Sequence, residues 1–154
     1  MKISRTAVAI LAALTLAGSL SACSSTVSLD ASPDSNNPAC AEISVRLPDQ
    51  VDQQSKRATN AQATGAWGNP TAVILRCGLP SADVSRFPCV TASGVDWLVD
   101  SSKKPSYRFI TFGREPATEV IVDSTKVSGV TVLDDLSTAI QSVPAGKHCS
   151  TVSN

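Results

Sequence analysis

The sequence predicts a small α+β domain in which a mainly antiparallel sheet of about five strands packs against one C-terminal helix. Three observations lead to this class. Short apolar or alternating segments follow one another between residues 43 and 123, and several of their connections are too short for the crossovers that parallel strands require. One stripe of apolar residues at helical spacing closes the chain. The length of 154 residues supports one domain rather than two.

The first predicted strand covers residues 43–47, where apolar and polar side chains alternate until Pro48 ends the pattern. The residues that follow, 49–66, are polar and have no convincing apolar face. This second stretch is therefore either a long loop or a short exposed helix.

Four further strands are predicted in the middle of the chain. The first of them is a continuous aliphatic and β-branched run, which is typical of a buried central strand. In the second, Val95, Trp97 and Val99 alternate with the residues between them, as they do in a strand of period two. The four strands cover residues 71–75, 95–100, 107–112 and 119–123.

The last predicted element is a helix over residues 131–143. Its apolar residues recur at helical spacing along one stripe and are Leu133, Leu136, Ile140 and Val143. Thr131 and Asp134 resemble a capping box at the start, with Asp in the place of Glu or Gln. Pro144 and Gly146 are typical of a helix end.

Residues 1–22 have the pattern of a bacterial lipoprotein signal peptide. A short basic start with Lys2 and Arg5 precedes an uncharged apolar run over residues 6–18. The 13 residues of this run would span roughly 20 Å as a helix, less than the roughly 30 Å of a bilayer core. Residues 20–23 then read Leu-Ser-Ala-Cys, which is the pattern of a lipobox.

Cys23 is the predicted lipidation site. Cleavage before it would make it the new N-terminus, and its thiol would carry a diacylglyceryl group. One acyl chain holds a protein at a membrane only marginally, because each buried CH₂ contributes about 0.8 kcal/mol, but two or three hold it essentially permanently. The alternative is an ordinary secretory signal whose cleavage site happens to carry a cysteine.

Composition divides the rest of the chain in two. Residues 23–39 are rich in Ser, Asn, Asp and Pro and are predicted to be a flexible tether. Residues 40–154 are predicted to form the single globular domain. This division places the domain close to the extracytoplasmic face of the cell membrane.

The chain has five cysteines, and lipidation of Cys23 leaves an even set of four. Outside the cytoplasm such a set indicates two disulfides, for which three pairings are possible. We favour Cys77–Cys89, which closes a short loop after an apolar strand, together with Cys40–Cys149, which ties the two ends of the domain.

Several classes of function lack support in the sequence. With 13 Lys and Arg against 13 Asp and Glu, no excess of positive charge suggests nucleic-acid binding. There is no C-x-x-C, and a zinc site would have only His148 beside Cys149 to draw on. G-x-S-x-G, S-x-x-K and H-E-x-x-H are absent. We therefore predict no cofactor, no metal and no catalytic residue.

Four short motifs carry a resemblance to a known family. They are Trp67-Gly68-Asn69-Pro70, Leu75-Arg76-Cys77-Gly78, Gly94-Val95-Asp96-Trp97 and Phe112-Gly113-Arg114-Glu115-Pro116. In this order, between about Cys40 and Cys149, they resemble a family of actinobacterial lipoproteins catalogued as a domain of unknown function, number 3515. The resemblance implies export, a lipid anchor in many members and a small cysteine-containing domain. It implies no activity.

The same motifs supply the candidate binding residues, which are Arg76, Arg114, Asp96, Trp67, Trp97 and Glu115. Arginine can bind a carboxylate or phosphate through two hydrogen bonds, and tryptophan offers a stacking face. One interpretation is therefore an anion- or glycan-binding cleft lined by Arg76, Arg114 and a tryptophan. The other is structural: both tryptophans fill the core, and the arginines pair with Asp96, Glu115 or Glu119.

Two functions remain. The first is a non-catalytic binding or accessory lipoprotein that contacts an envelope protein or polymer with the face away from its tether. The second is a small envelope hydrolase or transferase that uses carboxylates. Convergence of Asp96, Arg114, Glu115 and Glu119 in one open cleft would favour the enzyme, whereas their dispersion or pairing would favour the binding module.

Overall fold

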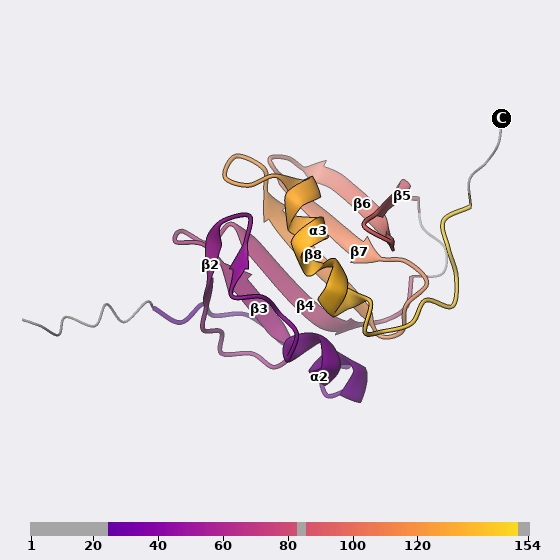
Figure 1. Ribbon diagram of the computed structural model, residues 1–154, viewed down its shortest axis with the longest axis horizontal. Helices are drawn as coiled ribbons and strands as arrows, with labels where there is room; N and C mark the ends of the chain where they lie inside the picture. Colours follow the sequence, from indigo (N-terminus) through magenta and orange to yellow (C-terminus); the bar gives the residue numbers. More distant parts are fainter. Residues whose placement is uncertain (1–24, 83–85, 151–154) are drawn as a thin grey trace, which may run out of the picture.

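A computed structural model describes residues 25–82 and 86–150 of the chain. Within these residues, eight strands form one antiparallel sheet in the order β1-β2-β3-β4-β8-β7-β6-β5, and helices α2 and α3 pack on one of its faces (Figure 1). The elements are α2 (Pro38–Ser44), β1 (Gln50–Val51), β2 (Gln54–Arg57), β3 (Thr64–Trp67), β4 (Val73–Leu79), β5 (Cys89–Ala92), β6 (Val95–Lys103), β7 (Ser106–Thr111), β8 (Ala117–Asp123) and α3 (Gly129–Ile140). The predicted α+β class and antiparallel sheet are confirmed, with more strands than expected and two helices. The predicted signal and Cys23 lie outside the described residues.

The centre of the sheet buries its apolar side chains against the helices. Leu75 on β4 is paired with Val120 on β8, and both are buried in the core with Leu136 of α3. Because side chains alternate between the faces of a strand, Arg76 and Glu119 point to the other face. The structure confirms the strands predicted at 71–75 and 119–123, with shifted ends. Their continuous apolar runs made them recognisable in the sequence.

Residues 43–47, predicted as a strand, belong instead to helix α2 and the turn after it. Asn37 caps the helix by accepting a hydrogen bond from the Ala39 N–H at 3.0 Å, and a proline occupies the first turn. The buried residues are Cys40, Ile43 and Leu47, spaced i, i+3 and i+7 as on one face of a helix. Val45, which the alternating pattern placed with them, is 78% exposed.

Residues 49–66, predicted as a loop or exposed helix, hold β1, β2 and most of β3. These strands are short and largely polar, so they lack the apolar alternation that identifies a strand. They are stabilised by a few buried contacts: Val51 is fully buried, and the Trp67 indole donates a hydrogen bond to the Pro48 carbonyl at 3.0 Å.

Helix α3 confirms the predicted C-terminal helix with shifted ends. Its N-cap is Ser128, whose hydroxyl accepts from the Thr131 N–H, so Thr131 lies inside the helix and is not the cap. The helix ends at Ile140, yet Val143 beyond it is still buried.

The four predicted cysteines form two disulfides, but the predicted pairing is wrong. Cys40 of α2 bonds to Cys77 of β4, and Cys89 of β5 bonds to Cys149. The error follows from the misassigned helix, because α2 turns Cys40 into the core against β4. Cys77 lies on β4 in the middle of the sheet, whereas Cys89 lies on the edge strand β5.

Part of the predicted tether is packed against the domain. The Val27 N–H donates to the Ala58 carbonyl, and the Asp34 N–H donates to the Gly78 carbonyl, both at 2.9 Å. Gly78 has φ +105°, and a Cβ there would lie 2.5 Å from the backbone of Asp34. Within the described residues, packing against the domain therefore extends back before Cys40, at least as far as Ser25. Among the described residues, no helix is long and apolar enough to cross a bilayer.

Candidate functional site

Both candidate tryptophans are core residues. Trp67 and Trp97 are fully buried, and the ring of Trp97 meets Phe109 edge to face at a centroid distance of 6.5 Å. Neither indole therefore offers a stacking face to a ligand.

Asp96 fastens the C-terminal segment to β6. Its carboxylate accepts hydrogen bonds from the Thr91 hydroxyl at 2.5 Å and from the Cys149 N–H at 3.1 Å, and it contacts His148 Nδ1 at 3.0 Å. Burial acts to raise the pKa of Asp96, but these hydrogen bonds outweigh it and hold the pKa below its usual value. The ionised carboxylate is thus committed to structural partners.

Arg114 lies close to this cluster. It is nearly fully buried, and its Nη1 donates to the Val143 carbonyl just beyond α3. Burial lowers the pKa of Arg114, and the negative charge of Asp96 opposes that shift. Glu115, the next residue, is exposed to solvent.

Arg76 belongs to a different part of the molecule. It pairs with Glu119 on the sheet face opposite the helices, and Arg108 pairs with the same carboxylate. The structure therefore does not bring Arg76, Arg114 and a tryptophan together in one cleft. The three candidate carboxylates do not converge either. Asp96 binds the C-terminal segment, Glu115 is exposed to solvent, and Glu119 is buried between Arg76 and Arg108.

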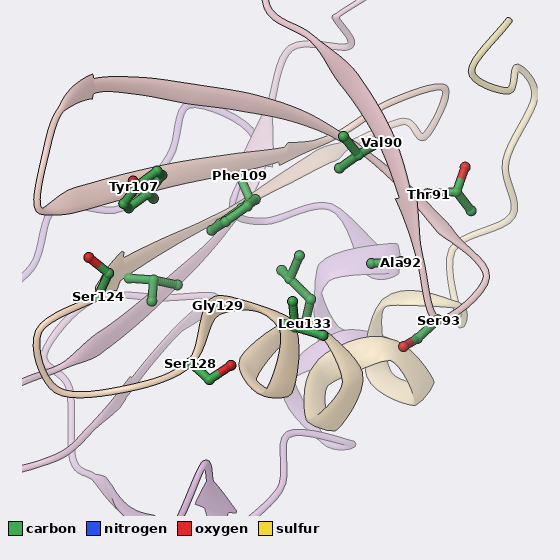
Figure 2. A pocket seen from close by; sticks show the side chains of 12 residues that line it. Val90, Thr91, Ala92, Ser93, Tyr107, Phe109, Ser124, Ser128, Gly129 and Leu133 are labelled. Atoms are coloured by element: carbon green, nitrogen blue, oxygen red, sulfur yellow. The ribbon is translucent and has the colours of Figure 1, made fainter. Parts of the chain in front are cut away.

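An apolar groove lies between the first turns of α3 and strands β5, β7 and β8 (Figure 2). Its volume is about 590 Å³, within the usual range of ligand sites. Its lining residues are Val90, Thr91, Ala92, Ser93, Tyr107, Phe109, Val122, Ser124, Ser128, Gly129, Val130 and Leu133. We call this hollow the α3–β5 groove.

An aromatic floor and two exposed valines shape the α3–β5 groove. The rings of Tyr107 and Phe109 are stacked, with centroids 6.5 Å apart and planes inclined by 18°. On opposite rims, Val90 of β5 is 40% exposed and Val130 of α3 is 75% exposed. A Cβ at Gly129 would lie 3.4 Å from the Phe109 ring, in ordinary van der Waals contact with the floor. Val90 and Val130 are two of the three exposed large apolar side chains among the described residues.

No lining residue of the α3–β5 groove carries a formal charge at neutral pH. Its polar side chains are the hydroxyls of Ser93, Tyr107, Ser124 and Ser128, whereas the hydroxyl of Thr91 donates to Asp96 on the other face of the sheet. Such a surface can hold an apolar body and hydrogen-bond its edge, but it offers no general acid, base or nucleophile–base pair. Elsewhere in the described chain, no cluster of His, Cys, Asp and Glu could hold a metal ion.

Sequence reasoning missed this groove because its residues come from four separate segments and are chemically ordinary. The nearest signal was the aromatic pair at positions 107 and 109 of a predicted strand. Its period-two spacing places both rings on one face.

The fold and these sites define a small disulfide-bonded α+β domain with an apolar groove. The chain belongs to the family described as "Protein of unknown function (DUF3515)", whose model matches residues 4–148. No curated protein and no solved structure shows a significant match to it.

Proposed function

We propose that this protein is a lipoprotein, anchored on the extracytoplasmic face of the cell membrane through lipid on Cys23, and that its domain is a non-catalytic binding module. The α3–β5 groove is the surface through which it binds. The uncharged lining of that groove is the observation that carries the binding function.

The cysteines support the anchor. Cys40, Cys77, Cys89 and Cys149 are all consumed in disulfides, and such bonds persist in oxidising compartments outside the cytoplasm. Cys23 is the fifth cysteine and stands at the end of the Leu-Ser-Ala-Cys motif. The family match begins at residue 4 and so includes this region. The resemblance to actinobacterial lipoproteins agrees with the same placement.

The packed N-terminal segment sets the domain close to the membrane. Val27 is only four residues beyond Cys23, and four extended residues span at most about 14 Å. Arg57 of β2 donates to the carbonyl and hydroxyl of Ser25 at 2.5 and 2.9 Å. In Figure 1 this segment leaves the molecule beside β2, whereas β5 lies at the opposite edge of the sheet. The β5 rim of the groove is therefore presented away from the anchor.

The ligand class follows from the lining. An apolar floor and exposed valine rims favour an uncharged ligand with an apolar body, because burial of an unpaired charge there would be costly. The Tyr107 and Ser128 hydroxyls fit hydrogen-bonding oxygens on that ligand, whereas those of Ser93 and Ser124 already donate to Asp134 and to the Pro105 carbonyl. The alternative of a carboxylate hydrolase or transferase has less support, since Glu119 is paired, Asp96 holds the C-terminal segment and Glu115 stands apart.

Cys23→Ala tests the anchor. Without the thioether lipid, we expect the protein to move from the membrane pellet to the soluble fraction or medium, because no other described element is a membrane span. Fractionation with salt and carbonate washes, followed by immunoblotting, measures this. Ser24→Ala is the matched control and should stay in the pellet. Retention of the Cys23→Ala protein through both washes would refute the anchor.

Val130→Asp tests the groove. Val130 is exposed in the first turn of α3, where a carboxylate is favourable for the helix, so the fold should be kept while a charge enters the rim. We expect the affinity for the uncharged dye N-phenyl-1-naphthylamine to fall about tenfold. The titration uses the Cys23→Ala background, which avoids lipid or detergent that would absorb the dye. Val45→Asp, equally exposed but outside the groove, is the control. Equal dye binding by both variants would contradict the assignment.

A further inference from the structure

The sheet face opposite the helices holds one buried carboxylate between two arginines. Glu119 of β8 stands in register with Arg76 of β4, and Arg108 comes from β7 on the other side. Arg76 Nε donates to Glu119 Oε1, and Arg108 Nε donates to Oε2. The Glu119 side chain is 0% exposed, whereas the side chains of Arg76 and Arg108 are 31% and 35% exposed. Each guanidinium therefore lies partly over the carboxylate and partly in solvent.

The two arginines keep donors for another acceptor. A guanidinium has five N–H groups in a fixed plane. Contacts with Glu119 involve Nε and Nη2 of Arg76 and Nε of Arg108. In the part of the chain that the structure describes, the remaining N–H groups of this pair have no protein acceptor. Glu119 thus acts as a positioning residue that fixes two guanidinium groups side by side.

These donors line a hollow of about 300 Å³. Its walls are Arg76, Asp100, Lys103, Ser106, Arg108 and Ile121. Asp100 is opposite Arg108 in the β6–β7 register, and one of its oxygens already accepts from the Ser102 N–H at 2.9 Å. With Glu119 included, three cations face two carboxylates, so the hollow keeps a surplus of one positive charge.

The arrangement fits a phosphate group better than a carboxylate. A free phosphate carries more negative charge and more acceptor oxygens than a carboxylate, so it can engage the unused N–H groups of two guanidinium groups and an ammonium together. Support of the sheet alone does not require these charges. The neighbouring pair Ile74 and Ile121 covers the same face with apolar side chains, and apolar replacements of buried ion pairs are often as stable.

We propose that Arg76 and Arg108, positioned by Glu119, form with Lys103 a binding site for a phosphate group. This site lies on the opposite sheet face from the α3–β5 groove and does not depend on the function proposed for that groove. The phosphate can be a free anion or the diester of a lipid headgroup.

Titration calorimetry on the full-length chain in a nonionic detergent tests the site with two probes. Inorganic phosphate represents the free anion, and glycerophosphoglycerol represents a lipid headgroup without its acyl chains. Arg108→Lys keeps the charge beside Glu119 but removes the planar fork, so we expect about a tenfold loss of affinity. Lys103→Gln should lose about threefold. Lys104→Gln removes the same charge one residue away, outside the hollow, and should bind like wild type.

Binding of either probe with this order of variants supports the site, and the preferred probe identifies the source of the phosphate. No heat with either probe at millimolar concentration overturns the proposal. Equal losses in Lys103→Gln and Lys104→Gln also overturn it, because they would indicate general attraction to surface charge. If circular dichroism shows that the Arg108→Lys protein is unfolded, the comparison of Lys103→Gln with Lys104→Gln still tests the phosphate site.

Discussion

At the scale of single residues, two buried carboxylates show how this small domain handles charge inside its sheet. Glu119 is neutralised by two arginines across neighbouring strands. Asp96 is instead stabilised mainly by hydrogen bonds from Thr91 and from the C-terminal segment. Both lie on one face of the sheet, yet β7 separates their strands. The two carboxylates therefore act independently: Glu119 links three neighbouring strands, and Asp96 holds the C-terminal segment against β6.

The lowered pKa of Asp96 predicts a pH dependence of stability. Because its folded pKa lies below the ordinary value of 3.8, the carboxylate stabilises the fold fully above pH 3.8, and that contribution is lost as the pH falls through the lowered folded pKa. Asp96→Asn should reduce the free energy of unfolding by about 1 kcal/mol at neutral pH, and by less in acid. Urea unfolding measured from neutral to acidic pH tests this.

Glu115→Gln is the control for the Asp96 experiment. Its side chain is exposed and lies beside the C-terminal segment at Pro144 and Gly146, and it makes no contact with Asp96, so its change of stability with pH should follow that of wild type. A constant difference between Asp96→Asn and wild type at every pH would contradict a role for the ionised carboxylate.

At the scale of elements, the sequence predicts those parts of the fold that carry a strong apolar pattern. Strands β4, β6, β7 and β8 have such patterns, and so does α3. Strands β1 to β3 do not, because only isolated residues such as Val51 and Trp67 face the core. Helix α2 was misassigned since Ile43, Val45 and Leu47 fit a period of two, although Asn37 and Pro38 before them are helix-start signals.

The candidate sites, like the elements, can be predicted from the sequence only where a local pattern marks them. Arg76 could be singled out from sequence, but its partner Arg108 could not, because the two meet only through the β4-β8-β7 strand order. The α3–β5 groove depends on how far α3 extends over the sheet, which no local pattern encodes. Residue types alone thus indicate chemistry, whereas the grouping of residues into a site is a property of topology.

At the scale of the whole molecule, the two disulfides connect regions that the sheet alone would hold weakly. Cys40–Cys77 fixes α2 and the N-terminal segment to β4, and both cysteines are buried in the core. Cys89–Cys149 joins the edge strand β5 to the C-terminal segment at the surface. The first therefore supports the core, and the second secures the edge that borders the α3–β5 groove.

This difference predicts unequal costs for removing the two bonds. The enclosed loops of 37 and 60 residues give chain-entropy contributions of about 4 kcal/mol each, with the longer loop ahead by only about 0.4 kcal/mol. Replacing Cys40 and Cys77 by Ala also removes two buried sulfurs from the core, which adds about 1–2 kcal/mol for lost packing. The shorter loop should therefore be the more costly bond to remove.

Urea unfolding of the Cys40→Ala/Cys77→Ala and Cys89→Ala/Cys149→Ala double variants measures these costs. The first should lose more free energy of unfolding, because buried packing outweighs the small entropic difference. The second should retain the core, yet bind the uncharged dye more weakly than wild type, since β5 forms one rim of the groove. A larger stability loss in the second variant would show that loop entropy dominates and that the buried sulfurs contribute little to packing.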